Sequence, residues 1–192
     1  MKKSKILTTT VIALLGLTLF FIGAAAEEEA EDLTFEQPLL ITSIGQSPGA
    51  MMAKVLAKRV DLKFVYNPTA KGDNLEDLDV NTIVAVVGAS GKGLGAAGLD
   101  IEDEISRVKG LLQAAKDLKI PMIIMHIEGV QRRGDMSNKL IKTFVPQSDY
   151  IIVQKSGNDD GLFTELSEEN EITMEQVEKA EGAAPVLDEI IG

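Results

Sequence analysis

The sequence predicts an α/β protein built on an open parallel sheet with helices on both faces. From Pro38 onward, short segments rich in β-branched residues alternate with segments of helical periodicity, as is typical of βαβ units. Segments 82–87 and 122–125 are almost continuously apolar, as expected for central strands that helices cover on both sides. We therefore expect a three-layer domain whose sheet has five or six strands.

The strands are predicted from short apolar runs bounded by turn residues. In chain order they are expected at 39–44, 63–66, 82–87, 122–125, 150–153 and, as a marginal sixth, 172–177. Helices are expected at about 48–60, 101–118, 136–145 and 162–170, and in the last residues of the chain, where Pro185 stands in the first turn.

Two helices have the clearest sequence signals. In the helix at 48–60, Ser47 is expected as the N-cap, Pro48 as the first helical residue, and one apolar face is expected to pack on the sheet. That face comprises Met51, Met52, Val55, Leu56 and Val60. The helix at 101–118 has a long amphipathic stripe, and Asp100 is placed to cap it.

The character of the strands suggests their order in the sheet. Strand 63–66 is short and polar enough for an edge, whereas strand 82–87 reads as central. The order 2-1-3-4-5 of a flavodoxin-like or Rossmann-like fold is therefore favoured over 3-2-1-4-5. In either order, ligands are expected beyond the carboxyl ends of the strands, where the strand order reverses.

Residues 1–26 have the pattern of a secretory signal peptide. Lys2, Lys3 and Lys5 precede an apolar run that ends in small residues at 24–26. We expect export to the periplasm or the extracellular space after cleavage; the alternative is an uncleaved helix that anchors the domain in the membrane. An acidic disordered spacer is expected at 27–37 and a single domain at 38–192.

The composition limits the classes of partner. The net charge is −11, and removal of three lysines with the signal peptide makes it more negative. Such a chain is not expected to bind nucleic acid or an anionic membrane surface. It contains no cysteine and one histidine, so neither disulfides nor a histidine- or cysteine-based zinc site is expected.

The segment Gly45-Gln46-Ser47-Pro48-Gly49 matches the G-x-S-x-G motif of a serine hydrolase. In such an enzyme, the residue after the serine donates its backbone N–H to the oxyanion, and proline has no N–H. A sharp turn into a helix therefore explains these residues better. A hydrolase that uses Ser47 or Ser90 with His126 remains an alternative function.

The segment 88–98 contains five glycines and Lys92 after the third expected strand. It lacks the first glycine and the serine or threonine of a nucleotide P-loop, and it is not expected to open the helix that starts near Asp100. A flexible crossover and a ligand-binding loop are equally compatible with this segment. His126, Arg132 and Arg133 follow the fourth expected strand, where two arginines could clamp an anion.

Stretches 40–47, 87–100, 125–129 and 132–134 resemble a family of uncharacterised exported bacterial α/β proteins, a domain of unknown function. The resemblance covers nearly all of the chain after the signal peptide. It implies an exported domain of this fold and brings no known activity, ligand or catalytic residue with it.

From the residues themselves we expect a domain that binds a small polar or anionic molecule at the carboxyl rim of the sheet, rather than an enzyme with a cofactor or metal. An interaction module of an envelope transport or sensing complex, with a protein partner, is a further alternative. The expected ligand-binding residues are Gly45, Gln46, Ser47, Ser90, Lys92, Gly93, His126, Arg132 and Arg133.

Overall fold

A computed structural model describes residues 33–192; the predicted signal peptide and residues 27–32 of the predicted spacer lie outside the described residues. Six strands form one parallel sheet in the order β2-β1-β3-β4-β5-β6. The strands are β1 (Leu39–Ile44), β2 (Phe64–Tyr66), β3 (Thr82–Val87), β4 (Met122–His126), β5 (Tyr150–Gln154) and β6 (Thr173–Val177). The predicted order 2-1-3-4-5 is confirmed, and the marginal sixth strand is present at the edge beside β5.

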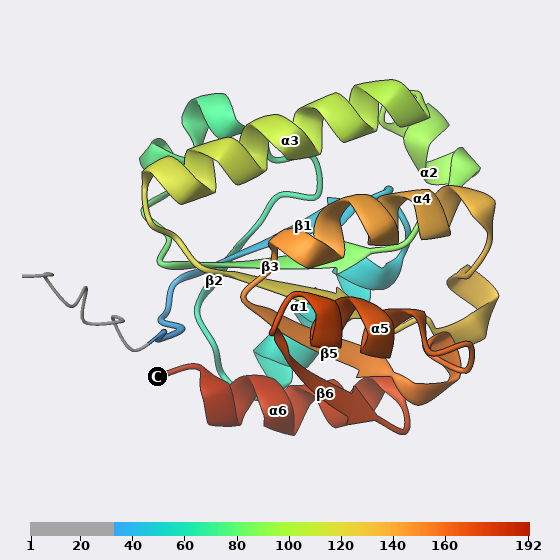
Figure 1. The fold of residues 1–192 in the computed structure, drawn as a ribbon. Helices are drawn as coiled ribbons and strands as arrows, with labels where there is room; N and C mark the ends of the chain where they lie inside the picture. Colours follow the sequence, from blue (N-terminus) through green and yellow to red (C-terminus); the bar gives the residue numbers. More distant parts are fainter. Residues whose placement is uncertain (1–32) are drawn as a thin grey trace, which may run out of the picture. The chain divides into compact units, whose positions relative to one another are not determined.

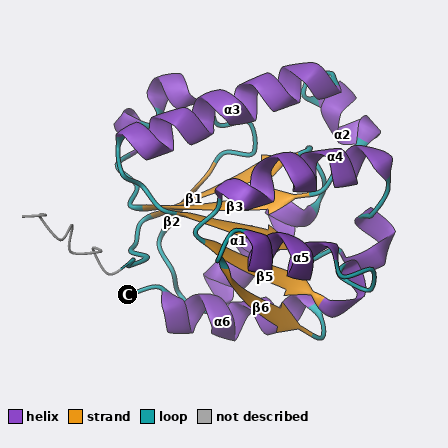
Figure 2. Ribbon diagram, in the orientation of Figure 1, coloured by secondary structure: helices purple, strands orange, loops and turns teal. Residues whose placement is uncertain are grey.

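Helices cover both faces of the sheet (Figures 1 and 2). They are α1 (Gly49–Arg59), α2 (Gly91–Ala96), α3 (Ile101–Asp117), α4 (Asp135–Phe144), α5 (Leu162–Glu169) and α6 (Ala183–Ile190). Apolar residues of α3, α4 and α5 join the hydrophobic core on one face, and those of α1 and α6 join the core on the other. Within residues 33–192, no helix is long and apolar enough to cross a bilayer.

Helix α3 begins where the sequence predicts. The Asp100 side chain accepts a hydrogen bond from the backbone N–H of Asp103, and the Asp103 side chain accepts one from the backbone N–H of Asp100. This reciprocal pair satisfies two amide groups that the helix itself leaves unpaired. The predicted N-cap at Asp100 is confirmed.

Helix α1 packs on the sheet through a face that only partly matches the predicted one. Its buried residues are Gly49, Ala50, Ala53, Leu56 and Ala57, and of these Leu56 belongs to the predicted face. Met51 is 47% exposed and Val55 is 52% exposed, so the predicted apolar face lies only partly against the sheet. Small residues let a helix backbone approach the sheet closely, which explains why the alanine stripe faces inward while Met51 and Val55 do not.

The glycine-rich segment after β3 is not an open loop, so that part of the prediction is wrong. Residues Gly91–Ala96 form the short helix α2, whose N-cap Ser90 accepts a hydrogen bond from the backbone N–H of Gly93 at 3.1 Å. Local hydrogen bonds of this kind compensate for the weak helix propensity of glycine. The backbone N–H groups of this segment are therefore partly used inside α2 and are not all free to bind a ligand.

The domain begins earlier than predicted. Phe35, placed in the predicted spacer, is 6% exposed, pairs with Ile191 in an isolated β-bridge and contacts Tyr150 edge to face. The backbone N–H of Glu36 donates to Thr82 Oγ1 at 2.8 Å. Residues 35–37 thus belong to the folded domain, because one aromatic side chain among acidic residues is enough to attach the segment to the core.

Candidate functional site

The turn from β1 into α1 lies at the carboxyl end of the sheet and is held by a buried carboxylate. Gly45 has a φ of 107°, a conformation that L side chains rarely adopt, and Gln46 follows with a φ of 57°. Glu104 Oε1 accepts the backbone N–H of Gly45 at 2.7 Å and the side-chain amide of Gln46 at 3.1 Å. This loop is therefore fixed rather than free to adapt to a ligand.

Glu104 is itself paired inside the domain. Arg107 Nε donates to Glu104 Oε2 at 2.9 Å and Arg107 Nη2 to Oε1 at 2.8 Å, while the guanidinium also reaches the carbonyl oxygens of Ala70 and Ser43 at 2.5 Å. The Glu104 and Arg107 side chains are 0% and 3% exposed. The sequence analysis missed this pair, because an acidic residue in the first turn of a helix is usually solvated.

Glu128, which follows β4, connects three loops at the same end of the sheet. Ser47 Oγ donates a short hydrogen bond to Glu128 Oε2, and Arg132 Nε donates to Glu128 Oε1 at 3.0 Å. Arg132 also donates to the carbonyl oxygen of Ala89 at 3.2 Å. The loops after β1, β3 and β4 therefore converge around one carboxylate, as the position of strand ends in a parallel sheet requires.

Ser47 does not cap α1 as predicted. The N-cap is Pro48, without a side-chain hydrogen bond, and the backbone N–H of Gly49 donates to Ser47 Oγ at 3.3 Å. Since Ser47 is 7% exposed and its hydroxyl points to a carboxylate, it links α1 to the loop after β4.

The glycine-rich segment packs against the same turn. The backbone N–H of Ser90 donates to the carbonyl oxygen of Gly45 at 2.8 Å, and a Cβ at Gly93 would collide with the carbonyl oxygen of Gln46. Gly45, Gln46, Ser90 and Gly93 thus lie together, as predicted, but they contact one another. Lys92 is exposed on α2.

His126 is a buried residue with two backbone partners. Its Nδ1 lies 2.9 Å from the carbonyl oxygen of Val87 and its Nε2 lies 3.2 Å from that of Gly129, and its ring packs against Phe163 at 5.2 Å between centroids. Burial lowers the pKa of His126 below its usual value, against the opposing effect of the two carbonyl groups. Its ring nitrogens are therefore directed at backbone carbonyls and not at Ser47 or Ser90.

The two adjacent arginines have different roles. Arg133 forms a bidentate pair with Asp160 at 2.9 and 2.7 Å, donates from Nε to Asn138 Oδ1 at 2.8 Å and donates to the carbonyl oxygen of Gly157. The hydrogen bond from Arg133 holds the pKa of Asp160 below its usual value. Arg133 thus joins the loops after β4 and β5, in place of the predicted anion clamp with Arg132.

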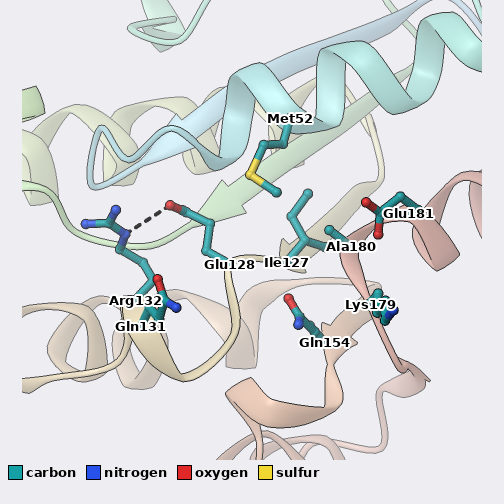
Figure 3. A pocket seen from close by; sticks show the side chains of 9 residues that line it. All are labelled: Met52, Ile127, Glu128, Gln131, Arg132, Gln154, Lys179, Ala180 and Glu181. Atoms are coloured by element: carbon teal, nitrogen blue, oxygen red, sulfur yellow. Dashed lines mark hydrogen bonds and ion pairs between the residues drawn. The ribbon is translucent and has the colours of Figure 1, made fainter.

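A hollow of about 430 Å³ lies at the carboxyl rim of the sheet (Figure 3). Figure 3 shows Glu128 and Arg132 on one side of it and Lys179, Ala180 and Glu181 on the other. The nine residues that line it are Met52, Ile127, Glu128, Gln131, Arg132, Gln154, Lys179, Ala180 and Glu181. Of the nine ligand-binding residues predicted from the sequence, Arg132 lines this hollow and the other eight do not.

The sequence analysis missed the other polar residues of this hollow. Gln131 follows β4, Gln154 ends β5 and Lys179 lies just beyond β6. Their positions at strand ends are the signal that could have identified them, but a weakly predicted sixth strand gave no reason to examine Lys179. Among residues 33–192, the side chains of Gln131, Gln154 and Lys179 have no hydrogen-bond or ion-pair partner; Gln154 is half-buried, and Gln131 and Lys179 are exposed.

The described part of the chain, residues 33–192, holds no cluster of three or more histidine, cysteine, aspartate or glutamate residues that could bind a metal ion. The residues that line the hollow supply hydrogen-bonding and charged groups, which can orient a polar molecule.

Comparisons with known proteins give one family and distant structural likenesses. No curated protein matches the sequence. The crystal structure of AlinE4, an SGNH-hydrolase family esterase, is 12% identical, with a TM-score of 0.33 and coverage of 74% of this chain and 75% of that one. A mutant of the esterase AlinE4 matches with the same identity and coverage and a TM-score of 0.32.

Structural likenesses as distant as these say nothing about the activity of this chain. The family comparison is of a different kind, because the match extends from the segment before β1 to the end of α6 and so covers the whole sheet. On this evidence the chain belongs, through residues 36–191, to the family described as "Domain of unknown function (DUF6305)".

Proposed function

We propose that this domain binds a small polar molecule with an acid group in the rim hollow, and that it acts outside the cytoplasm. The observation that carries the binding proposal is the convergence of unpartnered polar side chains, from Gln131, Gln154 and Lys179, on one hollow at the carboxyl rim. The signal-peptide pattern of residues 1–26 supports the extracytoplasmic location.

We place an acid group of the ligand close to Lys179, the cation of this hollow that has no ion-pair partner among residues 33–192. The negative charge of Glu128 is balanced by Arg132, at 3.0 Å, so the inner wall is close to neutral. Lys179 can attract an acid group, and the two carboxamides can donate hydrogen bonds to it. Glu181 also lines the hollow and opposes such a ligand, which makes its charge a useful test.

Hydrolysis through Ser47 or Ser90 has less support from this geometry. The hydrolase considered from the sequence uses His126 as the base, so a ring nitrogen of His126 must lie within hydrogen-bonding distance of the serine hydroxyl. Ser47 donates to Glu128, Ser90 caps α2, and both nitrogens of His126 face backbone carbonyls. Pro48 also lacks the N–H that would stabilise an oxyanion next to Ser47.

Thermal unfolding with acetate, succinate or phosphate tests the binding proposal. A ligand at ten times its dissociation constant should stabilise the domain by about 1.4 kcal/mol, which raises Tm by about 3–6 °C for a domain of this size. Lys179→Ala should abolish the shift, and Glu181→Gln should increase it because a repulsive charge is removed.

Lys92→Ala is the matched control, since Lys92 is an exposed lysine outside the hollow. A shift that is lost in Lys92→Ala and kept in Lys179→Ala would move the site to the glycine-rich segment. Absence of any shift with all three anions would contradict the proposal.

A further inference from the structure

The rim hollow continues into a second, apolar hollow along α1. This second hollow has a volume of about 310 Å³ and is lined by Pro48, Met51, Met52, Val55, Leu56, Arg59, Ala180 and Glu181. Met52, Ala180 and Glu181 line both hollows. In Figure 3 the Met52 side chain extends from α1 toward Ile127 and lies between the Arg132 and Glu181 sides of the rim hollow. The two spaces therefore adjoin along a shared wall.

The apolar hollow is lined by two large apolar side chains, Met51 and Val55, that are not buried in the hydrophobic core. Met51 and Val55 are four residues apart on α1, and residues at this spacing lie on the same side of a helix. They are 47% and 52% exposed, whereas the alanines of the same helix are buried against the sheet. Met51 and Met52 are unbranched and flexible, so they can adapt to an apolar chain laid against them.

We propose that the ligand of this domain is a single-chain amphiphile: its acid group lies in the rim hollow, and its apolar chain lies along α1 between Met51, Met52 and Val55. This inference rests on the proposed function and names the class of its ligand. Gln131, Gln154 and Lys179 line only the rim hollow, whereas Arg59 is the cation that lines the apolar hollow. The acid group is placed at the rim because there two carboxamides can donate hydrogen bonds to it beside the lysine, and this sets the direction in which the molecule lies.

The length of the groove sets the length of the chain. From Met52 to Arg59 the helix rises by about 10 Å, at about 1.5 Å per residue. An apolar chain of medium length, such as that of octanoate, can extend along this distance, whereas acetate can reach only the polar end. Each methylene that is fully removed from water should tighten binding by about fourfold.

Calorimetric titration with acetate and octanoate, the latter below its micelle-forming concentration, tests this assignment. If the groove covers three methylenes, octanoate should bind about sixtyfold more tightly than acetate. Val55→Ser should weaken octanoate binding by about fourfold, the effect of one methylene no longer covered, and leave acetate unchanged. Leu118→Ser is the matched control, since Leu118 is 39% exposed and lies at the end of α3, outside both hollows.

The outcomes separate this inference from the proposed function. If acetate and octanoate bind equally and both depend on Lys179, the rim site stands and the amphiphile is refuted. If neither anion binds, the proposed function fails and the amphiphile with it. If the domain self-associates and Val55→Ser disrupts the association without any effect on octanoate, the groove belongs to a second copy of the chain and the inference is overturned.

Discussion

Removal of the Glu104 carboxylate should destabilise the domain strongly, because this one group satisfies several buried partners. It accepts hydrogen bonds from the backbone of Gly45, from the Gln46 side chain and twice from Arg107. Glu104→Ala would leave the Arg107 guanidinium buried without its counter-ion, and breaking a buried pair in this way costs about 3–5 kcal/mol.

The expected loss is a large part of the stability of a typical domain, which is about 5–15 kcal/mol. Glu104→Gln is therefore a necessary second variant. It retains one carbonyl oxygen for Gly45 and loses the charge, so its effect should be intermediate between the wild type and Glu104→Ala. Equilibrium unfolding in urea, followed by circular dichroism, gives the free energies of unfolding of all variants.

Glu102→Ala is the control on the same helix. Glu102 pairs with Lys139, and their side chains are 71% and 51% exposed, so this loss should stay within about 1 kcal/mol because solvent screens the pair. If Glu104→Ala cost no more than Glu102→Ala, the argument that Glu104 fixes the turn after β1 would be wrong. A double variant of Glu104 and Arg107 should cost less than the sum of the two single variants, since it leaves no unpaired charge.

Three further predictions concern other parts of the chain. Burial lowers the pKa of His126 in the folded domain, so this histidine is protonated at a higher pH in the unfolded chain, near about 6.5, than in the folded one. The free energy of unfolding should therefore decrease as the pH falls below about 6.5, and this decrease should be absent in His126→Gln. Urea unfolding at several pH values measures it, and the same pH dependence in wild type and His126→Gln would contradict the role given to His126. Gly93→Ala should lower the unfolding free energy by about 1–3 kcal/mol, since the added Cβ collides with the Gln46 backbone. Gly95→Ala, where the Cβ meets open space on the same helix, should raise it by up to about 1 kcal/mol, and equal effects of the two substitutions would contradict this account. Expression of the full chain in a bacterial host should yield an exported protein that begins after Ala26; a full-length, cell-associated product would instead indicate an uncleaved anchor.

The strands could be predicted from the sequence because their signals are local. Residues 82–87 and 122–126 form β3 and β4, where continuous apolar character reflects helices on both faces. Asp100 identified the start of α3 because a capping side chain bonds to amide groups only a few residues away. The polar second strand indicated an edge, and with it the strand order.

The candidate site depended on contacts between residues that are distant in the sequence. Arg132 and Arg133 are neighbours in the chain, yet one balances Glu128 beside the hollow and the other joins the loops around Asp160. The sequence predicted that both would bind an anion. Glu128 is only four residues from Arg132, a spacing that could have indicated this pair, whereas Asp160 lies 27 residues from Arg133 and has no local signal.

The sequence by itself determined the α/β class, the strand order and the rim at which the loops meet, because periodicity and capping act over a few residues. Only the tertiary structure decided which polar groups at that rim are used internally and which remain unpartnered. The Glu104 carboxylate accepts the backbone N–H of Gly45 across a sequence separation of 59 residues, and Lys179 reaches the hollow from beyond the last strand. Such pairings follow from the packing of whole elements, in which each buried charge must find its partner wherever the fold places one.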